Sequence, residues 1–426
     1  MAPGIGQLLN GRRRAAVIFG LPSLIIVILA WLTLQSDRPT MLLARIIAPS
    51  VLTALLVLNL VVFGWRALAA IHAFVNGPYP SRAGRLGAVG LVVILVLTAV
   101  PHAIAWSYGT AAQAMFAQVF STPSRPSTSA VPPPSDQERT NVLLIGIDAA
   151  PGRTEALTDT LIVVSLDPVG RTVSMVSVPR DLASVPLGDG NVYGPKINSL
   201  ASWADRHPSQ FPEGGTRTLE NAVGALLGIP IHYYASVDLP GFVAMVDAVG
   251  GVDIQVTRPL SDPKYGAWFG VDRAWSIEPG LHHLDGANAL AYARIRKSPG
   301  ENDFTRAARQ QDVLVALRDR VVDAGVLMSL PRLMSAVGGS VRTDLPADRL
   351  PELAALVEQI GGSSTTKLVL GSPMIKSGGS TQYGSIFLPV PSRIAAMSKV
   401  VFGPPGIRPT WPLPKGSPAP SASAAP

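Results

Sequence analysis

Three long apolar segments occupy the first quarter of the chain, and a mixture of short apolar runs and amphipathic segments follows them. The apolar segments cover residues 15–34, 46–70 and 86–108, and each reaches the roughly 20 residues that an α-helix needs to cross a bilayer. A cleaved signal peptide would account for the first segment alone, but that segment is long and two more follow it. The pattern therefore predicts three transmembrane helices.

Arginine residues flank these apolar segments on one side of the predicted membrane. Arg12, Arg13 and Arg14 precede the first segment, and Arg82 and Arg85 lie between the second and the third. Because cytoplasmic loops are enriched in Lys and Arg, these flanks are expected in the cytoplasm. The chain is then predicted to be a multi-pass protein of the cell membrane, with everything after the third segment outside the cytoplasm.

Composition divides the chain into four parts. Residues 1–110 form the predicted membrane domain. Residues 111–138 are expected to be a linker, because from residue 121 the sequence is rich in Pro, Ser and Thr, which is typical of an extended tether. Residues 139–400 form the predicted globular domain. Residues 403–426 are rich in Pro, Ser and Ala and are expected to be a disordered tail.

The globular part begins with short apolar runs that are rich in β-branched residues. Residues 141–147 and 160–166 each fit a strand that is buried on both faces. Residues 171–178 alternate between polar and apolar positions like a further strand. Residues 167–170 (DPVG) place Pro and Gly where a type I turn favours them, so the last two strands are predicted to form an antiparallel hairpin.

Helical and strand-like patterns alternate over the rest of the domain, and the longest helical pattern is amphipathic. Strands and helices mixed in this way predict an α/β domain of three layers with a mixed central sheet. The predicted helices cover residues 218–228, 239–249 and 304–324, and the predicted strands cover residues 233–237, 252–256 and 290–295.

The hairpin brings charged residues to one edge of the predicted sheet. In an antiparallel hairpin the start of the outgoing strand lies beside the end of the returning strand, so Asp159 and Arg180 are expected to meet. If the strand at residues 141–147 runs parallel to the returning strand, Asp148 emerges at the same edge. Ligand sites in open α/β sheets favour the carboxyl ends of strands.

Further arginines follow towards the end of the domain. Arg294 and Arg296 are two residues apart, which on a strand points both guanidinium groups to one face. Two planar guanidinium groups side by side suit a diphosphate. Asp303 is a predicted helix N-cap, after which Arg306 and Gln310 share one helix face. An arginine in the first turn opposes the helix dipole unless an anion binds there or a carboxylate pairs with it.

The candidate ligands in this region indicate a particular kind of metal. The chain of 426 residues contains no cysteine, which excludes disulfides and thiolate metal sites and permits an oxidising compartment. Carboxylates without a nearby histidine suit Mg2+ or Mn2+, with phosphate oxygens and water completing the coordination. Taken singly, Asp148 fits an ordinary turn residue and Arg180–Asp181 fits a surface ion pair. Only the combination predicts a pyrophosphate-binding site.

The net charge of +7 has several possible meanings. A basic protein can bind nucleic acid, anionic lipid or a phosphorylated substrate. Much of the excess is explained by the arginines that flank the membrane segments, and no DNA-binding motif is visible in the sequence. Nucleic acid is therefore not expected as a partner.

An ordered series of motifs resembles the LytR-CpsA-Psr family. The resemblance covers about residues 141–321, which would be the core of the catalytic domain. The matching motifs are NVLLIGID (141–148), LTDTLIVVSLDP (157–168), VSVPRDL (176–182), KIN (196–198), TLENAVGALLGI (218–229), GFVAMVDAVGGVDI (241–254), LDGANALAYARIR (284–296) and DFTRAARQQ (303–311).

The resemblance implies an extracytoplasmic, membrane-anchored enzyme with an α/β/α sandwich whose core also accepts a prenyl chain. It implies a phosphotransferase that moves a glycopolymer from a polyprenyl-pyrophosphate carrier onto peptidoglycan, with Mg2+ (or Mn2+) as the cofactor. The metal-binding aspartates match Asp148 and Asp159. The pyrophosphate-contacting arginines match Arg180, Arg294, Arg296 and Arg306, and Lys196, Asp303 and Gln310 match supporting positions.

The chain departs from the family pattern at two points. Family members usually carry one membrane span, whereas three are predicted here. They also usually carry a serine where this chain has Thr158, which retains the hydroxyl group.

Several alternatives stay open at the level of the sequence. A pyrophosphatase that hydrolyses the lipid-linked donor would use the same residues, and a non-catalytic membrane sensor or transcriptional attenuator is a further alternative. Teichoic acid, arabinogalactan and capsule all fit as the polymer, with a bias in Ala, Arg, Pro and Gly that slightly favours arabinogalactan. Asp181 and Asp303 are weak candidates for a general base.

Overall fold

The computed structural model consists of two compact units, Met1–Ala117 with Ala347–Pro351, and Gln118–Pro346 with Glu352–Pro426. Within these units the structure describes residues 3–36, 49–77, 84–119, 132, 134–135, 137–148, 157–265, 274–322, 340–360 and 365–406.

The N-terminal unit consists mainly of helices that are long and apolar enough to cross a membrane, as predicted. The candidate spans are Arg13–Leu32, Ser50–Val75 and Leu86–Ala114. The helices that contain them are α2 (Arg13–Ser36), α4 (Pro49–Val75) and α5 (Arg85–Val119), preceded by the short α1 (Ile5–Leu9).

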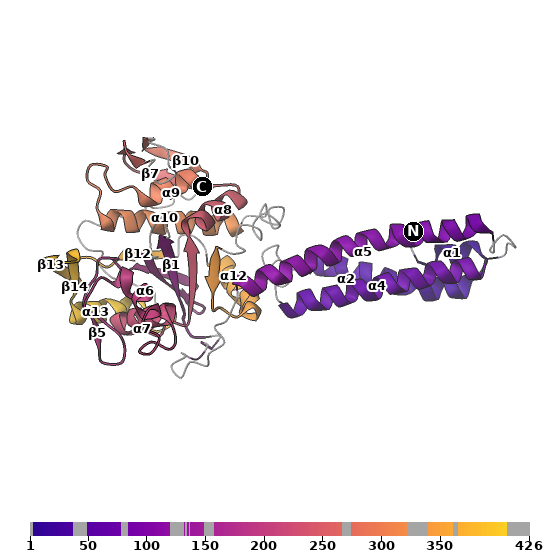
Figure 1. The fold of residues 1–426 in the computed structure, drawn as a ribbon, viewed down its shortest axis with the longest axis horizontal. Coiled ribbons are helices and arrows are strands. Elements are labelled where there is room, and N and C mark those ends of the chain that lie inside the picture. The colour runs from indigo at the N-terminus through magenta and orange to yellow at the C-terminus, as the bar shows by residue number, and fades with distance from the viewer. Residues whose placement is uncertain are drawn as a thin grey trace. The chain divides into compact units, whose positions relative to one another are not determined.

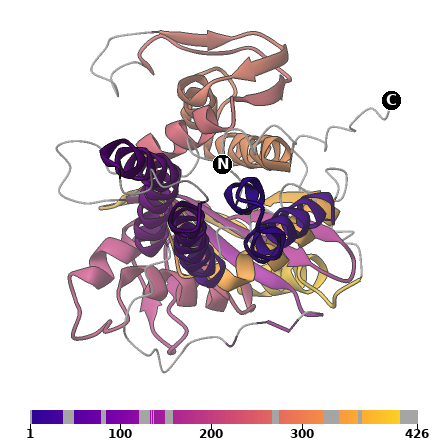
Figure 2. The same cartoon turned by 90° about the vertical axis from the view of Figure 1, so that its right-hand side faces the viewer.

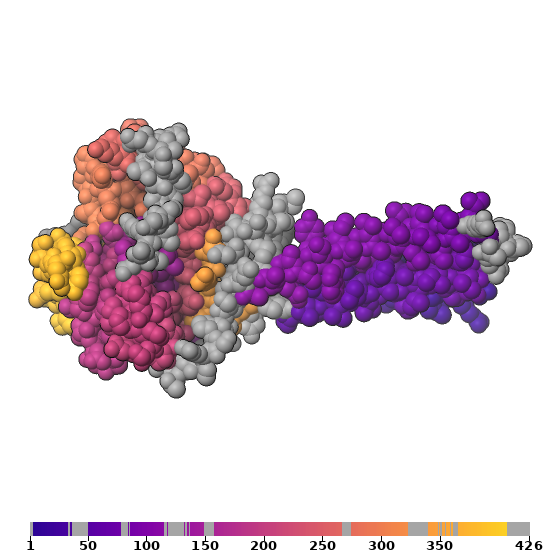
Figure 3. All heavy atoms as spheres, viewed as in Figure 1, coloured from indigo at the N-terminus to yellow at the C-terminus, as the bar shows by residue number. Residues whose placement is uncertain are grey.

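Polar contacts join the long helices to one another. Asn59 on α4 donates a hydrogen bond to the carbonyl of His102 on α5 at 3.1 Å, and its amide oxygen lies 2.7 Å from His102 Nδ1. Trp65 Nε1 on α4 donates to the carbonyl of Phe19 on α2 at 3.0 Å. Interhelical hydrogen bonds of this kind help to hold helices together in lipid. Figure 3 shows the atoms of this unit as indigo to purple spheres.

The helix α5 is longer than the predicted span. It continues to Val119, so residues 111–119 are helical although they were expected to belong to the linker. Most of the remaining predicted linker lies outside the described residues, as does the predicted tail after residue 406.

The second unit is built on a mixed sheet of six strands, in the order β11-β6-β1-β2-β3-β12. The hairpin predicted from the sequence is confirmed, because β2 and β3 pair antiparallel. The strand β1 is antiparallel to β2 and parallel to β6, and β12 is parallel to β3. The bounds are β1 (Thr140–Asp148), β2 (Leu157–Asp167), β3 (Thr172–Ser177), β6 (Tyr233–Asp238), β11 (Val341–Thr343) and β12 (Thr365–Val369).

Helices cover both faces of this sheet, which confirms the α/β/α sandwich (Figures 1 and 2). Successive strand residues point to opposite faces, so Leu161 and Val163 pack in one core while Ile162 lies in the other. The first core is completed by α6 (Leu200–Asp205), α7 (Gly215–Leu227) and α13 (Pro391–Val401), and the second by α10 (Asp303–Val322) and α12 (Leu350–Gln359).

A small lobe with its own hydrophobic core adjoins α10. It contains two helices and two pairs of short strands, and β7 pairs with β10 rather than with the central sheet. The elements are α8 (Leu239–Ala248), β7 (Val252–Val256), β8 (Leu260–Asp262), β9 (Trp275–Ile277), β10 (Gly280–Leu284) and α9 (Gly286–Arg294).

The strand predicted at residues 290–295 is wrong, because residues 290–294 lie in the helix α9 and Ile295 is its C-cap. Asp285 is the N-cap and its carboxylate accepts a hydrogen bond from the backbone N–H of Asn288. The helix contains four alanines, and alanine has the highest helix propensity. Ala289, Tyr292 and Ala293 of this helix pack into the core of the lobe.

The other predicted elements occur with small shifts at their ends. The helix predicted from residue 218 begins at Gly215 and ends before Gly228, which adopts a left-handed conformation with φ of 67°. The remaining elements are β4 (Val185–Pro186), β5 (Val192–Tyr193), the 3-10 helices η2 (Ile197–Ser199) and η4 (Ala347–Arg349), and the hairpin β13 (Ile375–Thr381) with β14 (Gly384–Pro389).

Candidate active site

A solvent-open pocket of about 450 Å³ lies where β1 ends and β2 begins. Its walls come from the sheet edge, the start of α8, the end of α9 and the first turns of α10. Seven of the nine charged or amide residues selected from the sequence line it: two aspartates, four arginines and one glutamine. The lining residues are Gly146, Ile147, Asp148, Asp159, Thr160, Arg180, Leu239, Arg294, Arg296, Arg306 and Gln310, so of the nine only Lys196 and Asp303 are absent.

A β-bulge brings Asp148 and Asp159 into the same pocket. Gly146 lies opposite Thr160 and Ile147 lies opposite Thr158, so Asp159 is an extra residue in β2. In a regular ladder Asp159 would face Ile147, and its side chain would point away from the face that Asp148 occupies. A bulge redirects a side chain locally, and here both carboxylates line the pocket.

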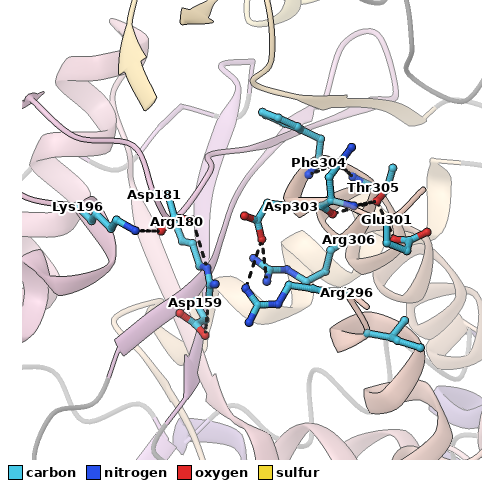
Figure 4. Close-up of polar contacts among 12 residues, drawn as sticks. Asp159, Arg180, Asp181, Lys196, Arg296, Glu301, Asp303, Phe304, Thr305 and Arg306 are labelled. Atoms are coloured by element: carbon cyan, nitrogen blue, oxygen red, sulfur yellow. Dashed lines mark hydrogen bonds and ion pairs between the residues drawn. The ribbon is translucent and has the colours of Figure 1, made fainter. Parts of the chain in front are cut away.

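Arg180 lies just beyond the end of β3 and meets Asp159, as the hairpin predicted. Its Nη1 donates a hydrogen bond to Asp159 Oδ2 at 2.8 Å, and Figure 4 shows the two side chains pointing toward one another. Burial alone would lower the pKa of Arg180, but Asp159, Asp181 and Asp303 together raise it above its ordinary value. Arg180 therefore stays charged in the pocket wall.

Lys196 lies beside this pair rather than in the pocket wall. Its Nζ donates a hydrogen bond to Asp181 Oδ1 at 2.7 Å, and Asp181 Oδ2 lies 3.9 Å from Arg180 Nε. Figure 4 shows Lys196, Asp181 and Arg180 in this order. Asp181 therefore lies between the side chains of Lys196 and Arg180, the arginine that lines the pocket.

Arg294 and Arg296 reach the pocket from the end of a helix, not from a strand. Arg294 is the last residue of α9, where a cation is favoured by the helix dipole. Its Nη2 lies 3.2 Å from Asp148 Oδ2. Ile295 has extended backbone angles, and Arg296, which follows it, also lines the pocket. The predicted convergence is present, but the strand geometry on which it was based is wrong.

The N-cap of α10 is Asn302 rather than Asp303. Asn302 Oδ1 accepts hydrogen bonds from the backbone N–H groups of Phe304 and Thr305, both at 2.9 Å. Asp303 is the first residue of the helix, and its Oδ1 lies 3.0 Å from Arg306 Nη1. The capping prediction was wrong by one residue, because Asn and Asp are both good N-caps.

Arg306 is the most deeply buried arginine of the pocket wall, with 9% of its side chain exposed. Burial lowers its pKa to about 10, the nearby Arg180 and Arg296 contribute in the same direction, and Asp303 opposes them. Its Nε is buried and has no hydrogen-bond partner. A guanidinium group that is buried near other cations is stabilised by an anion.

Some of the pocket wall could not be anticipated from charges. Leu239, the first residue of α8, and Gly146 and Thr160 at the bulge also line the pocket. Asp238, which precedes Leu239, caps α8 by accepting a hydrogen bond from Gly241 N at 2.7 Å. An Asp followed by Leu and Pro after a strand is a local signal for a helix start at such an edge.

The carboxylates of the pocket fit a cation that takes oxygen ligands. Asp159 Oδ1 is buried and has no hydrogen-bond partner. Within the described part of the chain, no group of three or more His, Asp or Glu side chains could hold a metal by itself. Mg2+ is commonly held by one or two carboxylates together with substrate phosphates and water. Two aspartates fit that mode.

The chain is similar to a protein family and to several known proteins. The LytR_cpsA_psr family model matches residues 107–386. A protein of Bacillus subtilis (strain 168), the polyisoprenyl-teichoic acid–peptidoglycan teichoic acid transferase TagV, is 32% identical over 250 residues. The match covers 57% of this chain and 59% of TagV, so it spans less than two thirds of that relative.

Solved structures share the fold. A protein from Enterococcus faecalis described as a transcriptional regulator is 25% identical, with a TM-score of 0.50, over 64% of this chain and 90% of that one. TagT bound to LIIa-WTA is 21% identical, with a TM-score of 0.51, over 67% of this chain and 98% of that one. The likeness to TagT concerns the mixed sheet with helices on both faces.

Proposed function

This chain belongs to the LytR-CpsA-Psr family, because the family model matches well over half of its residues. We propose that the protein transfers a glycopolymer from a polyprenyl-pyrophosphate carrier onto peptidoglycan. The observation that carries the proposal is the pocket in which four guanidinium groups and two carboxylates converge. TagV, which matches over part of its length, is named a transferase of this kind. The proposed donor is anionic, and the pocket is cationic.

The arginines would bind the two phosphates of the donor. Arg180 follows β3, Arg306 is on α10, and Arg294 and Arg296 come from the end of α9 and the residues after it. Planar guanidinium groups can each donate two hydrogen bonds to phosphate oxygens. Such groups stabilise negative charge that develops on the phosphates during transfer.

Asp148 and Asp159 would hold Mg2+ (or Mn2+). When bound, such an ion would neutralise phosphate charge and orient the diphosphate. Asp148 pairs with Arg294 and Asp159 pairs with Arg180. Each carboxylate therefore also orients an arginine of the pocket, so the two groups keep a role in arranging the phosphate-binding cations.

The proposed reaction is a phosphoryl transfer. A hydroxyl oxygen of a muramic acid residue in peptidoglycan forms a bond to the sugar-side phosphorus of the donor. The bond from that phosphorus to the bridging oxygen breaks, and polyprenyl monophosphate leaves with the bridging oxygen. The hydroxyl proton passes to a base, and the product is a phosphodiester between the glycopolymer and peptidoglycan.

The two aspartates suggested as bases are engaged with cations. Asp181 accepts a hydrogen bond from Lys196, and Asp303 pairs with Arg306. Neither lines the pocket. Their contacts favour a role in orienting the cations, and the catalysis that we propose rests mainly on positioning and electrostatics.

The same proposal places the globular unit outside the cytoplasm. Its support is the set of arginines that flank the candidate spans on one side, since cytoplasmic loops are enriched in such residues. Alkaline phosphatase fused after Gly403 should be active, because this reporter requires export. A fusion that is active only with a cytoplasmic reporter would contradict the orientation.

A product analysis tests the function directly. The full chain in detergent, with Mg2+ and a lipid-pyrophosphate-linked oligosaccharide of defined structure, should release polyprenyl monophosphate and attach the glycan to peptidoglycan fragments. Release of free sugar phosphate at the same rate with and without the acceptor would identify a pyrophosphatase instead. Binding of the donor without any turnover would favour a sensor.

A further inference from the structure

Arg309 is a buried arginine of α10 that does not line the pocket. Its side chain is 7% exposed. Nη1 donates a hydrogen bond to the carbonyl of Tyr292 at 2.6 Å, and Nη2 donates to the carbonyl of Ile295 at 2.5 Å and to Glu301 Oε2 at 2.7 Å. A buried guanidinium group is costly unless it is paired and hydrogen-bonded. These contacts join α9, the segment after it and α10.

Two consecutive residues of α10 cap the end of α9. The last four carbonyls of a helix have no partner within the helix. In α9 the carbonyl of Tyr292 accepts from Arg309, and the carbonyl of Ala293 accepts from Gln310 Nε2 at 3.4 Å. A cation at this end also complements the helix dipole. The next residue is Arg294, so these hydrogen bonds hold the backbone next to an arginine that lines the pocket.

Glu301 anchors the segment between the two helices. Its side chain is fully buried, and it pairs with Arg309 and with Arg258. Thr305 Oγ1 donates to Glu301 Oε2 at 2.7 Å, a contact that Figure 4 also shows. This segment carries Arg296, whose position therefore depends on the same buried carboxylate.

The residue after Gln310 joins the same helix to the central sheet. Gln311 Nε2 donates hydrogen bonds to Ser177 Oγ and to the carbonyl of Leu368, both at 2.8 Å. Ser177 is the last residue of β3, and Arg180 follows three residues later. Residues 309–311 therefore connect all the elements that carry the pocket arginines.

We infer that Arg309, paired with Glu301, is a positioning residue that sets the spacing of the pocket arginines and so favours a diphosphate over a monophosphate. The inference rests on the proposed function and names a further residue for that site. A diphosphate needs several guanidinium groups at fixed separations, whereas a monophosphate needs fewer. A looser arrangement of the pocket arginines should therefore weaken the binding of a diphosphate more than the binding of a monophosphate.

The chain offers a matched control on the same helix. Arg320 Nε donates to the carbonyl of Gly251 at 3.2 Å, and Nη2 donates to the carbonyl of Val249 at 3.5 Å. These carbonyls follow α8 at the end that is remote from the pocket residue Leu239. Arg320→Met therefore removes the same type of helix-end contact without touching the segments that carry the arginines.

The test is calorimetric titration of the full chain in detergent with inorganic pyrophosphate and, separately, inorganic phosphate, with Mg2+ present. Arg309→Met should weaken pyrophosphate binding about tenfold, the lower end of what outer-shell partners contribute, and should change phosphate binding less. Arg320→Met should leave both affinities unchanged. Arg309→Lys, which keeps the charge but cannot make all of the contacts, should lie between wild type and Arg309→Met.

Unchanged pyrophosphate affinity in Arg309→Met, or equal losses in Arg309→Met and Arg320→Met, would overturn the inference. If Arg309→Met does not fold, the decision passes to Arg309→Lys, for which wild-type discrimination between the two anions would be the overturning result. A wild-type chain that does not bind pyrophosphate would instead overturn the proposed function, and the inference with it.

Discussion

Arg180 donates a hydrogen bond to Asp159 at 2.8 Å, joining a candidate phosphate ligand to a candidate metal ligand. Arg294 and Asp148 form a second pair of the same kind, at 3.2 Å. The pocket thus contains cations that are partly neutralised by its own carboxylates, which offsets the cost of holding several guanidinium groups close together. Binding of a diphosphate with a cation would provide both sets of groups with additional partners.

Removal of Arg294 should strongly reduce turnover. Arg294→Ala deletes a guanidinium group of the pocket, and loss of one such stabilising donor lowers kcat by about a hundredfold or more. The measurement is the rate of polyprenyl monophosphate release. Arg393→Ala, an exposed arginine on α13 on the other face of the sheet, is the control. A folded Arg294→Ala variant with wild-type activity would contradict the assignment of the site.

Removal of divalent cations should abolish activity reversibly. Chelation should stop turnover, and Mg2+ should restore it. Asp159→Asn should raise the Mg2+ concentration needed for half-maximal activity, because a neutral amide is a weaker ligand than a carboxylate. Titration of Mn2+ binding provides a readout that is independent of activity. The control is Asp319→Asn, whose side chain is 58% exposed on α10. Equal cation binding by wild type and Asp159→Asn would exclude Asp159 as a ligand.

Stability should fall with increasing pH because of a buried glutamate. Burial, helped by Asp344 and opposed by Arg217, raises the pKa of Glu220 to about 8, from an ordinary value of 4.5. The unfolded chain therefore releases this proton at lower pH than the folded chain does. The contribution of Glu220 to stability is present below about pH 4.5 and is lost as the pH rises to about 8.

Glu220→Gln should flatten this pH dependence. The measurement is the Tm of the globular unit in the full chain, across the same pH range. Glu278→Gln, at an exposed position, controls for removing one carboxylate. If wild type and Glu220→Gln lose stability in parallel as the pH rises, Glu220 does not retain its proton in the folded protein.

A side chain at Gly146 should destabilise the bulge. A Cβ at this position would lie 2.8 Å from Thr160 Cβ on the neighbouring strand, which is closer than non-bonded carbon atoms pack. Gly146→Ala should therefore destabilise the globular unit by about 1–3 kcal/mol, as overpacking commonly does. Adding Thr160→Gly removes the opposing Cβ and should recover part of the loss. Chemical unfolding measures both effects, and a fully additive pair of substitutions would argue against the clash.

Local patterns in the sequence were sufficient to predict several features of the structure. The length of the apolar runs predicted three helices that can cross a membrane, and these are present. The turn at residues 167–170 predicted the pairing of β2 with β3, and with it the contact of Asp159 with Arg180. Helical spacing placed Arg306 and Gln310 on one face, and both line the pocket. Turn preferences and residue periodicity depend on only a few neighbouring residues, so both can be recognised in the sequence itself.

The tertiary structure decided the features that depend on distant segments. Asp159 lines the pocket together with Asp148 because of a bulge between β1 and β2. No pattern in the sequence predicted the position of this bulge. Residues 290–294 are helical, although the sequence predicted a strand, because α9 packs in the lobe and is capped by α10. Arg294 meets Asp148 across 146 positions of the sequence. Strand register and helix packing are set by the burial of apolar surface over the whole domain, and that information is not contained in any single stretch of the chain.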